Sequence, residues 1–224
     1  MGPAHHPPGR PGSPLVVVLC KPPAATDCKT RLAADVGRVQ AGRIYTRCLE
    51  AVLGAAARSG AAVRLAVAGP PLALAGIAAG HAPEAELVRQ VGATFAARQR
   101  HEIDRGLFDR HRPVAIMASD LAEPPDQAIG WALAAADPAA ARPGETAVAI
   151  VPAPDGGYSI LAAGGPLPEL AGVPMSSDRT LEHLRAALRR HGRRVAVAER
   201  PLADIDDGAD LARLGIVVPV PGEA

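Results

Sequence analysis

The stretch that decides the fold is Leu15-Val-Val-Val-Leu-Cys20, six consecutive residues without a charged or strongly polar side chain. A strand that is apolar at every position, rather than at every second one, is typical of a sheet covered by helices on both faces. Similar runs recur along the chain and alternate with longer helical stretches, at residues 63–68, 114–118, 146–151, 158–162 and 194–198. This alternation predicts a single α/β domain built on a doubly wound, mostly parallel sheet.

The segments between these strands predict the helices and the ends of the domain. Helices are expected at 37–58, 83–98 and 124–136, at 177–191 with Ser177 or Asp178 as the cap, and at 207–214. The last of these opens on D-G-A-D, which resembles a capping box with Asp in place of Glu. Residues 1–14, rich in Pro, Gly and His, are predicted to form a disordered arm, residues 15–218 the folded domain and residues 219–224 a tail.

Composition argues against several classes of function. Aromatic residues make up 2% of the chain, and 24 Lys and Arg residues stand against 23 Asp and Glu residues, so nucleic acid is not an expected partner. Neither a signal peptide nor a membrane-spanning helix is expected, and no membrane partner. The three cysteines are an odd number without C-x-x-C spacing, which favours a reducing compartment. We therefore expect a cytoplasmic protein, and we predict no particular oligomeric state.

The loop after the first strand carries an unusual set of positive charges. The chain uses arginine for 22 of its 24 basic residues, yet its only lysines, Lys21 and Lys29, bracket this loop. A lysine ammonium acts as a compact point charge against phosphate, and Arg31 can form a forked contact with a neighbouring oxygen. Lys21, Lys29, Thr30 and Arg31 are therefore the predicted phosphate-binding residues. A solvated loop before a helix is the alternative, because the Walker P-loop pattern is missing.

Aspartates follow two other strands. Asp120 comes directly after the run at 114–118, and Asp204 and Asp206 follow the run at 194–198. Because ligands collect beyond the carboxyl ends of strands in an α/β sheet, these carboxylates can converge on one edge and hold Mg²⁺ or Mn²⁺. Capping is the alternative for each, since Asp120 precedes Pro124 and the late aspartates precede the last predicted helix.

The segment Asp155-Gly156-Gly157-Tyr158 is a turn between two predicted strands. Its glycines can serve chain reversal alone, or they can let a substrate approach the backbone while Asp155 accepts a hydrogen bond from an acceptor hydroxyl. The two interpretations are equally weighted. Ser176 is a further candidate acceptor-binding residue, although Ser176 and Ser177 also fit the start of a helix.

Together these motifs resemble a bacterial family of glycosyltransferase-like proteins linked to arsenosugar biosynthesis and, more distantly, phospholactate guanylyltransferase. The shared motifs are K-T-R-L at 29–32, S-D at 119–120, D-G-G-Y at 155–158, and D-I-D at 204–206 with D-L at 210–211. The family's W-S-T stands here as Met175-Ser176-Ser177. The resemblance implies a GT-A type fold whose first loop holds phosphates and whose Asp120 region, with the late aspartates, holds a divalent metal.

The leading hypothesis is a metal-dependent nucleotidyltransferase. It moves a nucleoside monophosphate from a nucleoside triphosphate to a small phosphate- or hydroxyl-bearing acceptor and releases pyrophosphate, with Lys29, Arg31 and Asp120 as catalytic residues. A glycosyltransferase that uses a nucleotide diphosphate sugar is the first alternative. A catalytically silent ligand-binding module is the second.

Overall fold

Seven strands form one mixed sheet in the part of the chain that the computed structural model describes, residues 12–25 and 28–216. Their order across the sheet is β3-β2-β1-β4-β6-β5-β7. The strands are β1 (Leu15–Cys20), β2 (Ala62–Val67), β3 (Glu86–Arg89), β4 (Val114–Ala118), β5 (Ala147–Pro152), β6 (Tyr158–Ala163) and β7 (Arg194–Val197). The predicted arm and tail lie largely or entirely outside the described residues.

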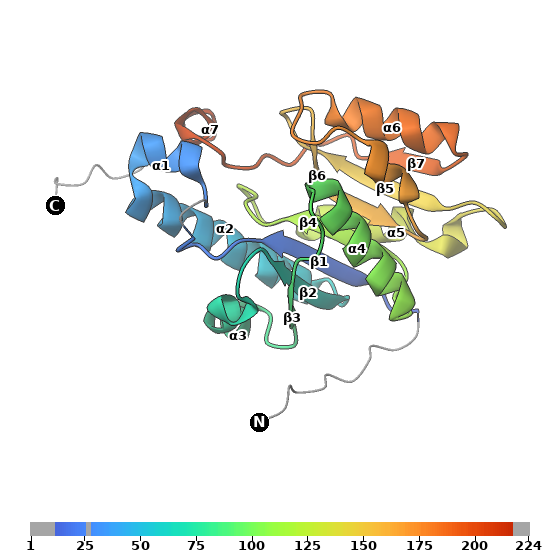
Figure 1. The fold of residues 1–224 in the computed structure, drawn as a ribbon, viewed down its shortest axis with the longest axis horizontal. Helices are drawn as coiled ribbons and strands as arrows, with labels where there is room; N and C mark the ends of the chain where they lie inside the picture. The colour runs from blue at the N-terminus through green and yellow to red at the C-terminus, as the bar shows by residue number, and fades with distance from the viewer. Residues whose placement is uncertain (1–11, 26–27, 217–224) are drawn as a thin grey trace.

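Helices cover both faces of this sheet, which confirms the doubly wound α/β prediction (Figure 1). The helices α2, α3 and α5 pack on one face, and α4 and α6 pack on the other. The bounds are α1 (Thr30–Val36), α2 (Arg38–Arg58), α3 (Ala75–His81), α4 (Phe95–Phe108), α5 (Asp126–Ala135), α6 (Thr180–Arg190) and α7 (Gly208–Arg213), with 3₁₀ turns at Pro71–Leu74, Pro138–Ala140 and Pro168–Gly172. No helix of the described residues is long and apolar enough to cross a membrane.

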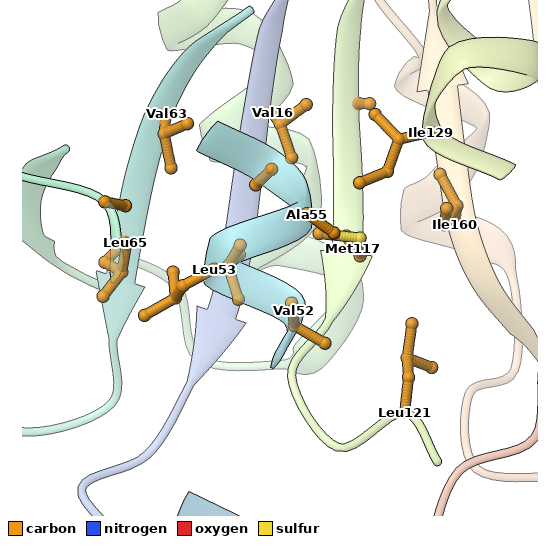
Figure 2. Close-up of a cluster of buried hydrophobic side chains, with 14 of the residues drawn as sticks. Val16, Val52, Leu53, Ala55, Val63, Leu65, Met117, Leu121, Ile129 and Ile160 are labelled. Carbon is orange, nitrogen blue, oxygen red and sulfur yellow. The ribbon is translucent and has the colours of Figure 1, made fainter. Parts of the chain in front are cut away.

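The first strand is the centre of the core, as its sequence predicts. All six of its residues are buried; Val16 and Val18 contribute to the cluster beneath α2, while Val17 and Leu19 contribute to the cluster on the opposite face. Figure 2 shows side chains of α2 gathered over the strands on the first of these faces. Because complete burial of one aliphatic side chain contributes about 1.5–3 kcal/mol, this double coverage fixes β1 as a rigid support for the loop that follows it.

One central strand runs against the others. β6 pairs antiparallel with both β4 and β5, whereas the remaining pairs are parallel. The cause is the connection between β5 and β6, residues 153–157, which is long enough for a hairpin but too short for the crossover that a parallel pair requires. The mostly parallel sheet is therefore interrupted at the D-G-G turn.

The helix predicted at 83–98 is wrong. Residues Glu86–Arg89 form the edge strand β3, and the helix α4 begins only at Phe95 and continues to Phe108. The short A-E-L-V-R sequence has a helical composition, but its backbone pairs with β2, and this tertiary pairing overrides local preference. The short helices α1 and α3 were not predicted.

Helix caps were predicted with mixed success. The capping box of α7 is confirmed, because Asp207 and Asp210 exchange the two expected side chain to backbone bonds. The cap of α6 is wrong: Arg179 occupies that position without a side-chain cap, and Ser177 Oγ instead accepts a bond from the Arg179 amide. The helix α7 is anchored at its start, since the Gly208 amide donates to Asp35 of α1, which lies beside α7 (Figure 1).

Candidate active site

Three carboxylates meet where β4 ends. The segment after β7 returns to the exit of β4 and pairs with it, so that the Ala122 amide donates to the Ala203 carbonyl (2.9 Å) and the Ile205 amide donates to the Asp120 carbonyl (3.1 Å). An isolated antiparallel bridge joins Leu121 to Asp204 between these two bonds. This pairing brings Asp120 together with Asp204 and Asp206, whose nearest ligand oxygens all lie within 4.8 Å of one another.

An ammonium group lies against the same carboxylates. Lys29 Nζ is 2.5 Å from Asp120 Oδ2 and 2.6 Å from Asp206 Oδ1, and the Lys29 side chain is only 9% exposed. The Arg31 guanidinium, which is largely exposed, bonds to the other oxygen of Asp206. Lys29 adopts a left-handed backbone conformation (φ 49°) at the start of α1, which is uncommon for a residue other than glycine. This conformation directs the first loop toward the aspartates.

The charges of the cluster are strongly coupled. Burial by itself would lower the pKa of Lys29, but the charges of Asp120 and Asp206 outweigh it and raise the pKa to about 12, so the ammonium stays protonated. Burial raises the pKa of Asp204 to about 6, with further upward contributions from the charges of Asp120 and Asp206. Asp204 therefore changes charge closer to neutral pH than an ordinary carboxyl group.

A buried tyrosine ties the first loop to the β4 exit. The Tyr45 hydroxyl on α2 lies 2.9 Å from Ser119 Oγ, accepts a bond from the Lys21 amide (3.1 Å) and lies 3.2 Å from the Lys21 carbonyl. Sequence analysis missed Tyr45, because nothing in the spacing of α2 distinguishes a tyrosine that packs in the core from one that holds a loop. Its hydroxyl fixes Lys21 relative to Asp120.

Most of these groups line one cleft of about 320 Å³, although Asp204 lies outside its lining. It contains six of the predicted residues: Lys21, Lys29, Thr30, Arg31, Asp120 and Asp206. Its other walls come from the strand ends, from α2 and from the start of α4. They include Ser119 of the S-D motif, and also Tyr45, Gln90, Phe95 and Arg98, which the sequence analysis did not select.

The predicted acceptor residues lie outside the lining of this cleft. Gly156 has φ +88°, and a Cβ built on it would lie 1.8 Å from the Asp178 carbonyl oxygen, so this glycine is explained by close packing against the start of α6. Asp155 Oδ1 accepts a bond from the Gly157 amide (2.9 Å), which stabilises the turn. The turn lies on the Asp204 side of the cluster, because the Leu202 amide, two residues before Asp204, donates to the carbonyl of Pro152 at the end of β5 (2.9 Å).

Tyr158 and Ser176 occupy different surroundings. Tyr158 is largely buried, and its hydroxyl donates to Gln99 Oε1 at 2.8 Å, so its visible role is to join β6 to α4. Ser176 is exposed and has a left-handed backbone (φ 58°) ahead of α6. The candidate phosphate-binding and metal-binding residues therefore lie together, and the candidate acceptor-binding residues lie outside this cluster.

The donor set of the cluster fits a hard divalent cation. Asp120, Asp204 and Asp206 offer carboxylate oxygens from two strand exits, which are the ligands that Mg²⁺ and Mn²⁺ prefer. Lys29 touches two of the three carboxylates, so cation binding and the Lys29 contacts share the same oxygens. A polyphosphate that enters the cleft can bind Lys29 in place of the carboxylates, and the carboxylate oxygens can then bind a metal ion.

The seven-stranded sheet with helices on both faces is a GT-A-like α/β fold, shared with solved structures. A candidate nucleotide-diphospho-sugar transferase from Desulfovibrio desulfuricans G20 superposes with a TM-score of 0.78 at 22% identity, covering 91% of this chain and 86% of its own. The chain belongs to the family described as an uncharacterized protein conserved in bacteria (DUF2064), whose model matches residues 51–177. That match contains Asp120 and the D-G-G-Y turn.

More distant neighbours share the fold. A 4-diphosphocytidyl-2C-methyl-D-erythritol synthase from Anaerococcus prevotii DSM 20548 superposes with a TM-score of 0.52 at 11% identity, covering 89% of this chain and 96% of its own. A second structure of a synthase of that name gives a TM-score of 0.51 at 13% identity, with 90% and 96% covered. No curated protein matches the sequence significantly.

Proposed function

We propose that the protein is a metal-dependent nucleotidyltransferase that moves a nucleoside monophosphate from a nucleoside triphosphate to a small phosphate- or hydroxyl-bearing acceptor. The observation that carries this proposal is the contact of Lys29 with Asp120 and Asp206 beside Asp204, because it unites a phosphate-binding loop with a carboxylate cluster. In the reaction the acceptor oxygen forms a bond to the α-phosphorus as the bond to pyrophosphate breaks. No covalent intermediate on the protein is needed.

Charge neutralisation of the leaving group is the main role of the cationic side chains. Lys29 and Arg31 exchange their carboxylate partners for oxygens of the β- and γ-phosphates, and neutralise the charge that develops on the leaving pyrophosphate. Mg²⁺ or Mn²⁺ held by Asp120, Asp204 and Asp206 would supply further charge stabilisation to the phosphate oxygens. The D-G-G-Y turn on the Asp204 side, together with Ser176, is the proposed place of the acceptor.

A glycosyltransferase that uses a nucleotide diphosphate sugar is the second candidate. The observation in its favour is that Lys29 and Arg31 are both already paired with carboxylates, which reduces the positive charge available to a triphosphate. A diphosphate needs less positive charge. Calorimetry with nucleoside triphosphates and with diphosphate sugars discriminates between the two, because only the true donor binds in a metal-dependent way.

The direct test is a pyrophosphate-release assay with Mg²⁺, the four nucleoside triphosphates and a panel of phosphorylated and hydroxylated acceptors. We expect release with one nucleotide and its loss in Asp120→Asn and Lys29→Met. The matched control is Asp126→Asn, since Asp126 is an aspartate paired with Arg58 on the surface. Absence of release in every combination, while nucleotides still bind, would exclude the nucleotidyltransferase and leave the glycosyltransferase or a ligand-binding module. Absence of nucleotide binding would exclude the nucleotidyltransferase and the glycosyltransferase.

A further inference from the structure

We propose that Phe95 and Arg98, at the start of α4, form the nucleobase subsite of this cleft, and that Arg98 selects guanine. This inference rests on the proposed use of a nucleotide and adds the identity of its base. Neither residue belongs to the motifs that suggested the function. Both line the cleft that contains Lys29 and Asp120.

The local backbone explains why both side chains reach the cleft. Gly92 has φ +136°, and a Cβ there would lie 2.8 Å from the Arg98 amide nitrogen, so the loop after β3 folds tightly onto the first turn of α4. Thr94 caps that turn by accepting a bond from the Ala97 amide (3.1 Å). Phe95 and Arg98 are three residues apart and therefore share one face of the helix.

Arg98 differs from the other arginine of the cleft in its partners. Arg31 is paired with Asp206, whereas Arg98 has no carboxylate within ion-pair distance among residues 12–25 and 28–216. Its one hydrogen bond runs from Nη1 to Gln90 Oε1 (3.2 Å), and its buried Nε has no acceptor in that described part of the chain. Its Nη2 makes no hydrogen bond with the described residues, so this end of the guanidinium is available to a ligand.

Gln90 makes this wall a donor surface. Its amide nitrogen donates to the carbonyls of Cys20 (3.1 Å) and Ala66 (2.8 Å), and its oxygen is used by Arg98. Both N–H donors of the Gln90 side chain are therefore committed, its oxygen accepts from Arg98, and Arg98 itself presents only N–H groups. A ligand edge with two adjacent acceptors satisfies such a fork, as O6 and N7 of guanine do, whereas adenine places its amino donor there.

Phe95 supplies the second feature of a base site. Its ring is 46% exposed in a chain with only two phenylalanines, and it lines the cleft next to Arg98. An aromatic face beside a guanidinium binds a flat base by stacking and by edge hydrogen bonds. A phosphate group would make no stacking contact with the ring, so Phe95 together with Arg98 favours a base over another anion.

The base subsite and the phosphate subsite come from different parts of the sheet. The helix α4 follows β3 at one edge, and the Gln90 side chain that contacts Arg98 reaches the Cys20 carbonyl at the end of β1. Asp120 follows β4, the other neighbour of β1. A nucleotide whose phosphates contact Lys29 therefore extends its base toward α4.

The test is calorimetric titration of the full-length protein with GTP, UTP, CTP and ATP in Mg²⁺, for wild type, Arg98→Met and Phe95→Leu. We expect GTP to bind at least about tenfold more tightly than ATP, and Arg98→Met to weaken GTP about tenfold while it leaves ATP nearly unchanged. Phe95→Leu weakens all four nucleotides by a similar factor. The matched control is Arg100→Met, an exposed arginine on the same helix that pairs with Asp104.

The contrary results are distinct from one another. Equal binding of the four nucleotides to wild type, or an unchanged GTP preference in Arg98→Met, overturns the base assignment and leaves the proposed function intact. Weaker binding of pyrophosphate to Arg98→Met makes Arg98 a phosphate contact and overturns it as well. Failure of every nucleotide to bind overturns this inference together with the proposed function.

Discussion

Lys29 Nζ lies 2.5 Å from the Asp120 carboxylate, although 91 positions separate the two residues in the chain. The contact crosses from the loop after β1 to the exit of β4, two strands that are neighbours in the sheet. It is the point at which the phosphate-binding loop and the acidic cluster meet, so the account of function depends on how this pair responds to ligands.

Lys29→Met removes the cation that two carboxylates share. We expect the free energy of unfolding to fall by about 1–3 kcal/mol without metal, a range that allows for the partial exposure of Asp120 and Asp206. Mg²⁺ should restore part of this loss, because it relieves the repulsion among the carboxylates. Urea denaturation with and without Mg²⁺ measures both effects. A variant as stable as wild type, or one that Mg²⁺ does not stabilise, contradicts the arrangement.

Tyr45→Phe removes the hydroxyl that connects Lys21 with Ser119. The loss of these bonds should cost about 1–2 kcal/mol of unfolding free energy and should also weaken nucleotide binding severalfold, because Lys21 is no longer held against the β4 exit. Ser59→Ala is the control, since its hydroxyl bonds at the far end of α2. Calorimetry and denaturation are compared for both variants. Equal nucleotide affinity in the two would show that Tyr45 is only a core residue.

Gly156→Ala tests the close packing of the D-G-G turn. The substitution combines a left-handed backbone with a Cβ that meets the Asp178 carbonyl, and we expect a loss of about 2 kcal/mol or more. Gly157→Ala is the matched variant, because its Cβ meets only the side chain of Asp155 at 3.0 Å. It should be clearly less destabilised in a thermal melt. Similar losses at both positions would remove the packing explanation for Gly156.

Glu102→Gln tests a buried charge on α4. Glu102 is 0% exposed, its nearest cation is Arg64 Nη1 at 3.6 Å, and its oxygens have no hydrogen-bond donor among the described residues. Burial raises the pKa of Glu102 more than Arg64 lowers it. The folded state therefore holds this proton more tightly than the unfolded state, and stability is lost as pH rises through the folded pKa.

The expected pH dependence follows from the raised pKa of Glu102. A neutral Gln does not lose a proton, so the stability of Glu102→Gln relative to wild type should increase from pH 4 to pH 8 in denaturation experiments. A difference that stays constant over this range, or that decreases, would mean that Arg64 compensates fully for the buried charge.

The residues that were predicted correctly are those whose neighbours in the sequence already determine their environment. The run at Leu15–Cys20 has only one way to be covered, whereas the predicted convergence of the aspartates also depends on the return of residues 203–205 to the exit of β4. The helix predicted at 83–98 failed because β3 is a short edge strand, whose state depends on pairing with β2. Its composition carries no sign of that partner.

The sequence predicted that several candidate site residues would lie together, but it did not predict their contacts. Lys29 and Asp206 were expected on the same rim, yet the sharing of one ammonium between two carboxylates depends on the left-handed backbone at Lys29 and on the pairing of 203–205 with 120–122. Arg98 could not be selected either. Whether Arg98 has a carboxylate partner depends on its neighbours in the folded structure. The predicted helix at 83–98 also placed Arg98 at a helix end, whereas it lies in the first turn of α4.

The central claim is that Lys29 and the three aspartates bind a nucleotide's phosphates together with a divalent cation. Calorimetric titration of the four nucleoside triphosphates into wild-type protein, in Mg²⁺ and then in EDTA, tests this most directly, with Asp206→Asn measured under both conditions for the nucleotide that binds most tightly. The account predicts binding that weakens at least about tenfold when Mg²⁺ is removed, and a much smaller Mg²⁺ effect in the variant. Binding that is equally tight in Mg²⁺ and EDTA, or no binding in either, would contradict it.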